Sequence, residues 1–158
     1  MFGKKRIINR GISGDITAGV LHRLDEVIRH QPKQIFILIG TNDLARKVPQ
    51  WEVVANIYQI VGRIVAGSPR TKVYVQSVFP VNPTFNSFPG HVKNSELIEA
   101  VNAELQQNQN KQAFTYVDIA AVLKDKTGYL NPEYTNDRLH LNGAGYRVWA
   151  AAIRKLVK

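Results

Sequence analysis

Residues 34–40 read Gln-Ile-Phe-Ile-Leu-Ile-Gly, and this stretch decides the fold class. It is nearly all apolar, which is typical of a strand that is covered on both faces, as the strands of parallel sheets are. Other β-rich runs at residues 6–9, 72–79 and 114–119 predict three more strands along the chain.

Apolar residues between these runs recur every three or four positions, which predicts amphipathic helices. Four stretches keep one face apolar in this way: residues 16–28, 53–64, 97–105 and 148–156. Strands that alternate with helices of this length predict right-handed βαβ units, and therefore an α/β fold with helices on both faces of a doubly wound parallel sheet. No composition break or internal repeat divides the chain, so we expect residues 1–158 to form a single domain.

The composition is that of an ordinary globular protein. With 158 residues, 44% of them hydrophobic and 21% charged, the chain is long and apolar enough to bury a core, which argues against disorder. It has no cysteine, which excludes a disulfide scaffold, a thiolate metal site and a cysteine nucleophile. The net charge is +9, yet only residues 4–6 form a run of three basic residues. We therefore expect solvated surface charge and no nucleic-acid partner.

The sequence also limits where the protein can be located and which cofactors it can bind. No apolar run approaches the ~20 residues of a membrane span, and residues 1–9 do not have the pattern of a signal peptide, so the sequence leaves both the cytoplasm and export open. The four histidines are not spaced as metal ligands, so we expect no metal and no other cofactor.

Two polar clusters sit where predicted strands end. Residues 9–17 (NRGISGDIT) form a glycine-punctuated turn before the first helix, where backbone N–H groups can face a ligand. Alone, this stretch is best interpreted as a tight turn. Residues 40–43 (GTND) follow the most hydrophobic strand. The Asn42 amide there can donate to a developing oxyanion, which is worth roughly 3–4 kcal/mol, although Asn-Asp is also ordinary turn chemistry.

The third cluster is residues 136–143, just before the last helix. Asp137 and His140 are three positions apart, a spacing that places two side chains side by side on one turn. A carboxylate that holds one imidazole nitrogen leaves the other nitrogen free as a base. A lone Asp–His pair is more often structural. The three clusters together, at one edge of the predicted sheet, supply both oxyanion donors and an Asp–His pair.

These stretches resemble the SGNH (GDSL-type) hydrolase family, and within it the small esterases similar to platelet-activating-factor acetylhydrolase. The matching stretches, NRGISGDIT (9–17), QIFILIGTND (34–43) and NDRLHLNGAGY (136–146), keep the family's order and spacing. The resemblance implies a three-layer, flavodoxin-like sandwich and a metal-free hydrolase of small acyl esters, with acetyl as the first expectation. The alcohol would be a carbohydrate or a lipid-like molecule.

The resemblance also implies roles for four residues. The backbone N–H of Gly14 and the side-chain amide of Asn42 would be the oxyanion donors. His140 would be the general base, and Asp137 would orient it.

One part of the family pattern is missing. The family's nucleophilic serine lies in a Gly-Asp-Ser motif at the end of a first strand, upstream of the glycine turn, and this chain contains no Gly-Asp-Ser. The resemblance places that strand inside the sheet, between the predicted strands at 6–9 and 34–40. We therefore expect an N-terminally incomplete chain whose first strand is missing. The alternative is a catalytically inactive binding or interaction protein on the same fold, which folds alone or as a strand-exchanged homodimer.

Ser13, water and the loop at residues 82–90 offer further candidates for the nucleophile and for the pocket wall. Ser13 lies in the glycine turn, but its position suits loop geometry better than attack. Water activated directly by His140 would react slowly, because covalent catalysis is lost. Residues 82–90 form the one long irregular stretch. Its Phe85 and Phe88 either face the substrate or pack within the loop. His91, which follows the loop, is a weaker candidate for the pocket wall.

Overall fold

The computed structural model describes residues 7–84 and 88–158. At its centre, the described residues form a parallel sheet of three strands in the order β1 (Gln34–Ile37), β2 (Lys72–Gln76) and β3 (Thr115–Val117). All three lie inside predicted runs but are shorter than them. The chain after each strand turns into a helix or loop, and the polar cluster at residues 40–43 comes soon after the end of β1.

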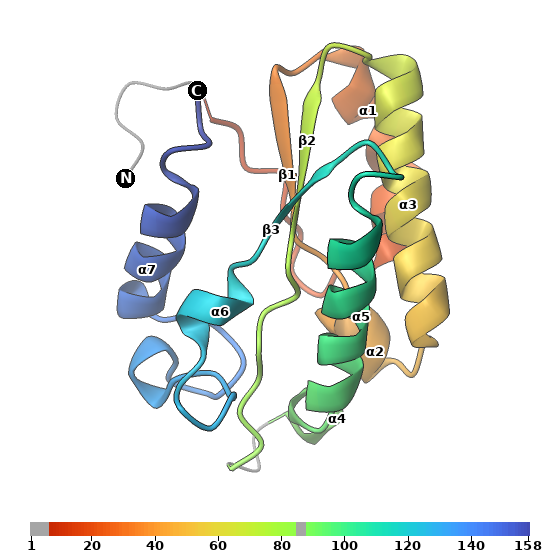
Figure 1. Cartoon of the computed structure of the whole chain (residues 1–158). Coiled ribbons are helices and arrows are strands. Elements are labelled where there is room, and N and C mark those ends of the chain that lie inside the picture. The colour runs from red at the N-terminus through yellow and green to blue at the C-terminus, as the bar shows by residue number, and fades with distance from the viewer. Residues whose placement is uncertain (1–6, 85–87) are drawn as a thin grey trace.

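Helices cover both faces of the sheet, so the molecule has the three α/β layers that the sequence predicts (Figure 1). One face carries α1 (Thr17–Arg29), α3 (Gln50–Gly67) and α5 (Ser95–Asn108); the other carries α6 (Ala120–Leu123) and α7 (Gly143–Ile153). Short elements join them: α2 (Thr41–Ala45), α4 (Pro89–Val92) and a 3-10 turn, η1 (Pro132–Tyr134).

Two apolar cores, one for each face, hold these layers together. The larger core joins the sheet to α1, α3 and α5, and the smaller joins it to α6 and α7. Alternate residues of β1 serve the two cores: Ile35 and Ile37 face the larger, while Phe36 faces the smaller and stacks on Tyr74 with 4.6 Å between ring centroids. Full burial of one such side chain stabilises the fold by about 1.5–3 kcal/mol.

The predicted strand at residues 6–9 is wrong for the part that the structure describes. Ile7, Ile8 and Asn9 have no strand conformation, and the side chains of Ile7 and Ile8 are exposed. A parallel strand needs a neighbour to accept and donate its backbone hydrogen bonds. In the described sheet the outer edge of β1 stays unpaired, and residues 7–9 do not join it.

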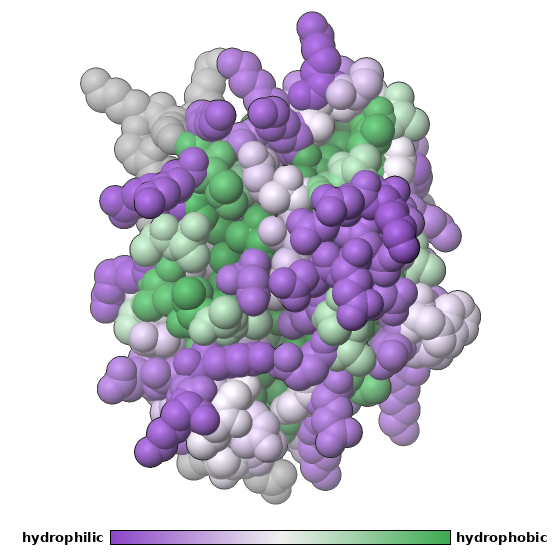
Figure 2. All heavy atoms as spheres, viewed as in Figure 1, coloured by the Kyte–Doolittle hydropathy of each residue, from purple (hydrophilic) through white to green (hydrophobic). Residues whose placement is uncertain are grey.

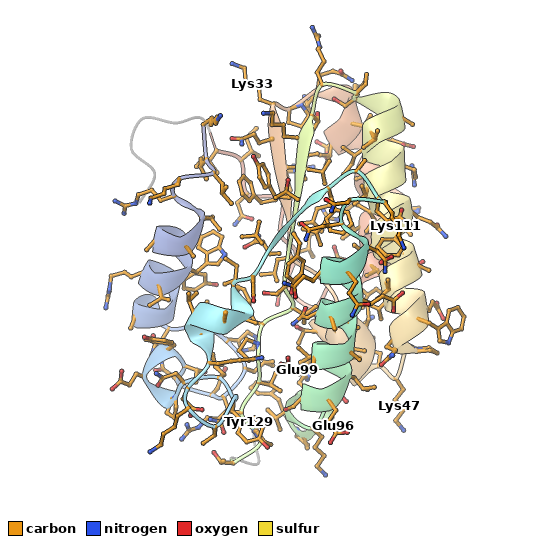
Figure 3. All side chains as sticks on the ribbon, viewed as in Figure 1. Lys33, Lys47, Glu96, Glu99, Lys111 and Tyr129 are labelled. Carbon is orange, nitrogen blue, oxygen red and sulfur yellow. The ribbon has the colours of Figure 1, made fainter. Side chains whose placement is uncertain are left out.

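The C-terminal ends of the strands point to one end of the molecule, where α2, α4 and α6 lie (Figure 1). Lys47 and Glu96 mark this end in Figure 3, and Lys33 marks the opposite end. Figure 2 shows a polar surface over the end of α5 and apolar side chains reaching the surface beside α7. Among the described residues, no helix is both long and apolar enough to cross a membrane.

Candidate active site

A buried carboxylate, that of Asp43, links the end of the glycine turn to α2, which follows β1. Asp43, in α2, is 1% exposed, and its two oxygens accept the backbone N–H of Thr17 at 3.0 and 3.1 Å. The Thr17 hydroxyl donates to the same carboxylate at 2.5 Å, and its oxygen accepts from the Asn56 amide at 3.0 Å. Asp43 therefore binds the N-terminal end of α1 to α2, a role that spacing along the chain did not indicate.

Two more side chains complete this junction. The Asn42 amide donates to the Asp15 carbonyl at 2.9 Å, and the Arg46 guanidinium donates to the Gly14 carbonyl at 3.0 Å. Asn42 thus bonds to the residue next to Gly14, so that the two predicted oxyanion donors lie at the same junction. Among the described residues, none accepts the N–H of Gly14 or the second N–H of Asn42.

Backbone geometry at two glycines makes this arrangement possible. Gly14 has φ +75° and Gly40 has φ +125°, both in the region that favours glycine. At Gly40 a side chain would be strained by the positive φ and would also crowd its neighbours, because a Cβ there would lie 3.2 Å from Val78 and 3.3 Å from Val53. The chain can therefore turn sharply from β1 into α2 and bring Asn42 over the end of the sheet.

Asp137 and His140 form a hydrogen-bonded pair. His140 Nδ1 lies 2.7 Å from Asp137 Oδ2, and the other carboxylate oxygen accepts the backbone N–H of Leu139 at 3.0 Å and of His140 at 2.8 Å. The residues form a bend rather than a helical turn, with Arg138 at φ +73°. The exposed imidazole keeps Nε2 without a hydrogen-bond partner among the described residues.

The hydrogen bonds also set the charge of Asp137. Burial raises its pKa, but the N–H groups and imidazole of His140, together with the Leu139 N–H, outweigh burial and lower the pKa to about 2. Asp137 is therefore a carboxylate at any pH near neutrality, and it accepts the Nδ1 proton of His140. The unprotonated nitrogen is then Nε2, which is the form a general base requires.

Two aromatic rings connect this pair to Asn42. The ring of Phe88 meets the His140 ring edge-on, with centroids 5.6 Å apart, and meets the His91 ring edge-on at 6.1 Å. His91 Nε2 in turn lies 3.1 Å from Asn42 Oδ1. Phe88 thus lies beside His140, whereas Phe85 lies outside the described residues. No spacing in the sequence indicated that His91 contacts Asn42.

A cavity of about 170 Å³ adjoins this group at the end of β1. Its walls include Ile12 and Asp15 of the glycine turn, Leu38 and Asn42, and Phe79 after β2. A larger hollow of about 460 Å³ lies at the other end of the sheet and contains none of the predicted site residues. The smaller cavity is therefore the one next to the polar groups described above.

Ser77 and Ser13 differ in their exposure and surroundings. Ser77 is fully buried, and its hydroxyl oxygen accepts the backbone N–H groups of Ile119 at 2.9 Å and Ala120 at 2.8 Å. It therefore caps the start of α6 and does not face the site. Ser13 is exposed in the glycine turn. Within the described residues, no three His, Asp or Glu side chains gather as metal ligands.

A comparison with protein families decides what kind of protein this geometry belongs to. The model of the GDSL-like lipase/acylhydrolase family matches residues 1–148. The chain belongs to this family. The resemblance read from the three sequence motifs is thereby confirmed, and so is the α/β fold, which GDSL-like structures share.

Individual relatives of this GDSL-like protein extend the comparison. The platelet-activating factor acetylhydrolase IB subunit alpha2 of Rattus norvegicus is 29% identical over 159 residues, 99% of this chain and 66% of that subunit. The N-acylneuraminate cytidylyltransferase of Escherichia coli is 32% identical over 136 residues, 84% of this chain and 30% of that enzyme. The solved structure of a GDSL-like lipase from Bacteroides thetaiotaomicron is 28% identical, with a TM-score of 0.83, and the match covers 95% of this chain and 74% of that one. The chain thus spans just under two thirds of the acetylhydrolase subunit and under a third of the cytidylyltransferase.

Proposed function

We propose that this GDSL-like chain is the larger part of an ester hydrolase that removes a small acyl group, acetyl first, from a carbohydrate or lipid-like alcohol. The observation that carries the proposal is the Asp137–His140 pair, joined at 2.7 Å at the same end of the sheet as the Asn42 amide. The name of the acetylhydrolase relatives supports acetyl as the acyl group.

His140 would serve as the general base and Asp137 as its orienting partner. Because Asp137 is ionised and accepts the Nδ1 proton, Nε2 of His140 can take the proton of an attacking hydroxyl. The same Nε2–H then protonates the departing alcohol, which leaves an acyl group on the nucleophile. Water, activated by His140 in the same way, releases the acid and restores the free hydroxyl.

Gly14 and Asn42 would stabilise the oxyanion. Attack converts the ester carbonyl oxygen into an anion, and donors that are already in place lower the energy of that state without reorganisation. The backbone N–H of Gly14 and the second amide N–H of Asn42 are available for this in the described residues. Each donor contributes roughly 3–4 kcal/mol in acyl-transfer enzymes.

The nucleophile is proposed to be a serine upstream of Met1, at the end of an additional parallel strand. The sequence has no Gly-Asp-Ser motif, and Ser77 is occupied as a cap. Support comes from the outer edge of β1, which has no partner strand among the described residues, and from the 170 Å³ cavity at its end. A strand added on that edge would deliver its last residues beside Asn42, because parallel strands end on the same side of a sheet.

A second candidate function is a catalytically inactive binding or interaction protein on the same fold. The absence of Gly-Asp-Ser from the chain favours it. It predicts that the 158 residues are the whole mature protein and that they fold alone or as a strand-exchanged homodimer without esterase activity.

One experiment separates the two. The chain is produced both as printed and in an extended form, which includes the coding sequence that lies in frame directly upstream of Met1, and both are assayed with p-nitrophenyl acetate. We expect the extended form to contain Gly-Asp-Ser and to hydrolyse the ester, and the printed chain to be inactive. An in-frame stop close upstream, or an extended form without activity, contradicts the proposal and favours the binding protein.

A further inference from the structure

The short helix α4 carries a histidine to the proposed oxyanion donor. Gly90 of α4 lies against α2, and a Cβ on it would be in van der Waals contact with the Ala45 carbonyl oxygen, at 3.7 Å. Val92, at the end of α4, is 2% exposed and belongs to the larger core. Because α4 is anchored against α2 in this way, His91 has a fixed position beside Asn42.

The contacts of Asn42 define the orientation of its amide. Its Nδ2 donates to the Asp15 carbonyl at 2.9 Å, and its Oδ1 lies 3.1 Å from His91 Nε2. An amide oxygen only accepts hydrogen bonds, so His91 must donate to it from Nε2. Both the nitrogen and the oxygen of the Asn42 amide are then hydrogen-bonded, and these two bonds fix the direction of its second N–H.

The surroundings of His91 suit this donor role. Burial, and then the nearby His140, lower the pKa of His91, so its ring is neutral at pH 7. A neutral imidazole carries one proton, and the contact with Asn42 places that proton on Nε2. The Phe88 and His91 rings meet edge-on, with centroids 6.1 Å apart, and this contact further restricts rotation of the imidazole.

We propose that His91 is a positioning residue, which holds the Asn42 amide so that its free N–H faces the carbonyl oxygen of the bound ester. The inference rests on the proposed ester hydrolysis but names a residue that none of the three sequence motifs contains. His91 does not contact the reacting atoms, and its effect passes through Asn42.

The first test is kinetic and uses the extended form with p-nitrophenyl acetate. His91→Phe keeps a ring beside Phe88 but removes the donor, and we expect kcat to fall about 10-fold with little change in KM, a fraction of the 10²–10³-fold loss that follows removal of a whole oxyanion donor. His91→Gln places an amide N–H near the position of Nε2 and should recover most of the rate. His22→Gln, an exposed histidine of α1, is the matched control.

A double-mutant cycle distinguishes positioning from general damage. If His91 acts through Asn42, His91→Phe should have no further effect on kcat in an Asn42→Ala background, because interacting residues are not additive. A 10-fold loss that persists in that background overturns the proposal, as does wild-type kcat in His91→Phe.

The second test does not depend on catalysis and uses the printed chain. The Asn42 side-chain amide is followed by ¹H–¹⁵N NMR from pH 8 to pH 5, together with the ring protons of His91, in a His140→Gln background that removes the other nearby imidazole. We expect the amide resonances to move with the same midpoint as the His91 ring, and to stay still in His91→Phe. An amide that does not follow His91 overturns the inference even if the extended form is an active esterase, and an amide that follows it supports the inference even if the ester proposal fails.

Discussion

Removal of the Asp43 carboxylate should destabilise the protein strongly, although Asp43 takes no part in the proposed chemistry. Asp43 and Thr17 are 1% and 0% exposed, so the hydrogen bonds between them form out of contact with water. In Asp43→Ala, both the backbone N–H and the hydroxyl of Thr17 lose their acceptor.

The size of the effect follows from these two donors. A buried donor left without a partner costs about 1–3 kcal/mol, and two of them, less the recovered cost of burying a carboxylate, give a loss of about 3 kcal/mol in the free energy of unfolding. For a domain of this size that corresponds to a fall of about 6–12 °C in Tm. Asp43→Asn keeps one acceptor oxygen and should lose roughly half as much.

The assay is urea unfolding followed by circular dichroism, with thermal melts in parallel. Asp25→Ala is the matched control, because Asp25 pairs with Arg63 on the surface with its side chain 84% exposed. Exposed pairs contribute about 0–1 kcal/mol, so this variant should be close to wild type. If Asp43→Ala unfolds within about 0.5 kcal/mol of wild type, the account of the junction between the glycine turn and α2 is refuted.

Three further changes follow from the same structure. The Asp137 carboxylate has its pKa lowered from 3.8 to about 2, so its stabilising effect is complete above about pH 5 and is lost as the pH falls through about 2. The difference between the urea midpoints at pH 5 and pH 2.5 should therefore be larger in wild type than in Asp137→Asn, and equal differences would contradict this. Gly40→Ala forces a Cβ into a positive-φ position against Val53 and Val78 and should cost about 3 kcal/mol, measured by urea unfolding; a variant as stable as wild type would show that the turn relaxes. Asn142 caps α7 by accepting two backbone N–H groups, at 2.9 and 3.1 Å, so Asn142→Ala should lose about 1–2 kcal/mol in the same assay, and an unchanged midpoint would count against the cap.

Periodicity and strand composition predict the layers of this molecule because they depend on local sequence. The first four residues of the run at 34–40 form β1, and the apolar face at 53–64 lies within α3, whose buried residues belong to that face. The stretch at 6–9 has the composition of a strand as well. Its described part stays irregular because pairing depends on a neighbouring strand, which the local sequence does not report.

The candidate site was predictable where its partners are close in sequence. Asp137 and His140, three residues apart, form their hydrogen bond within one bend. Asp43 reaches Thr17 across 26 positions, and His91 reaches Asn42 across 49. Such contacts depend on how α2 and α4 pack, and no spacing rule gives that packing.

The most direct test of the central claim is the esterase activity of His140→Ala in the extended form. If His140 is the base that Asp137 orients, kcat/KM for p-nitrophenyl acetate should fall at least about 1,000-fold, while His22→Ala should match wild type. A His140→Ala variant that is folded and retains the wild-type rate would contradict the proposed ester hydrolysis at this site.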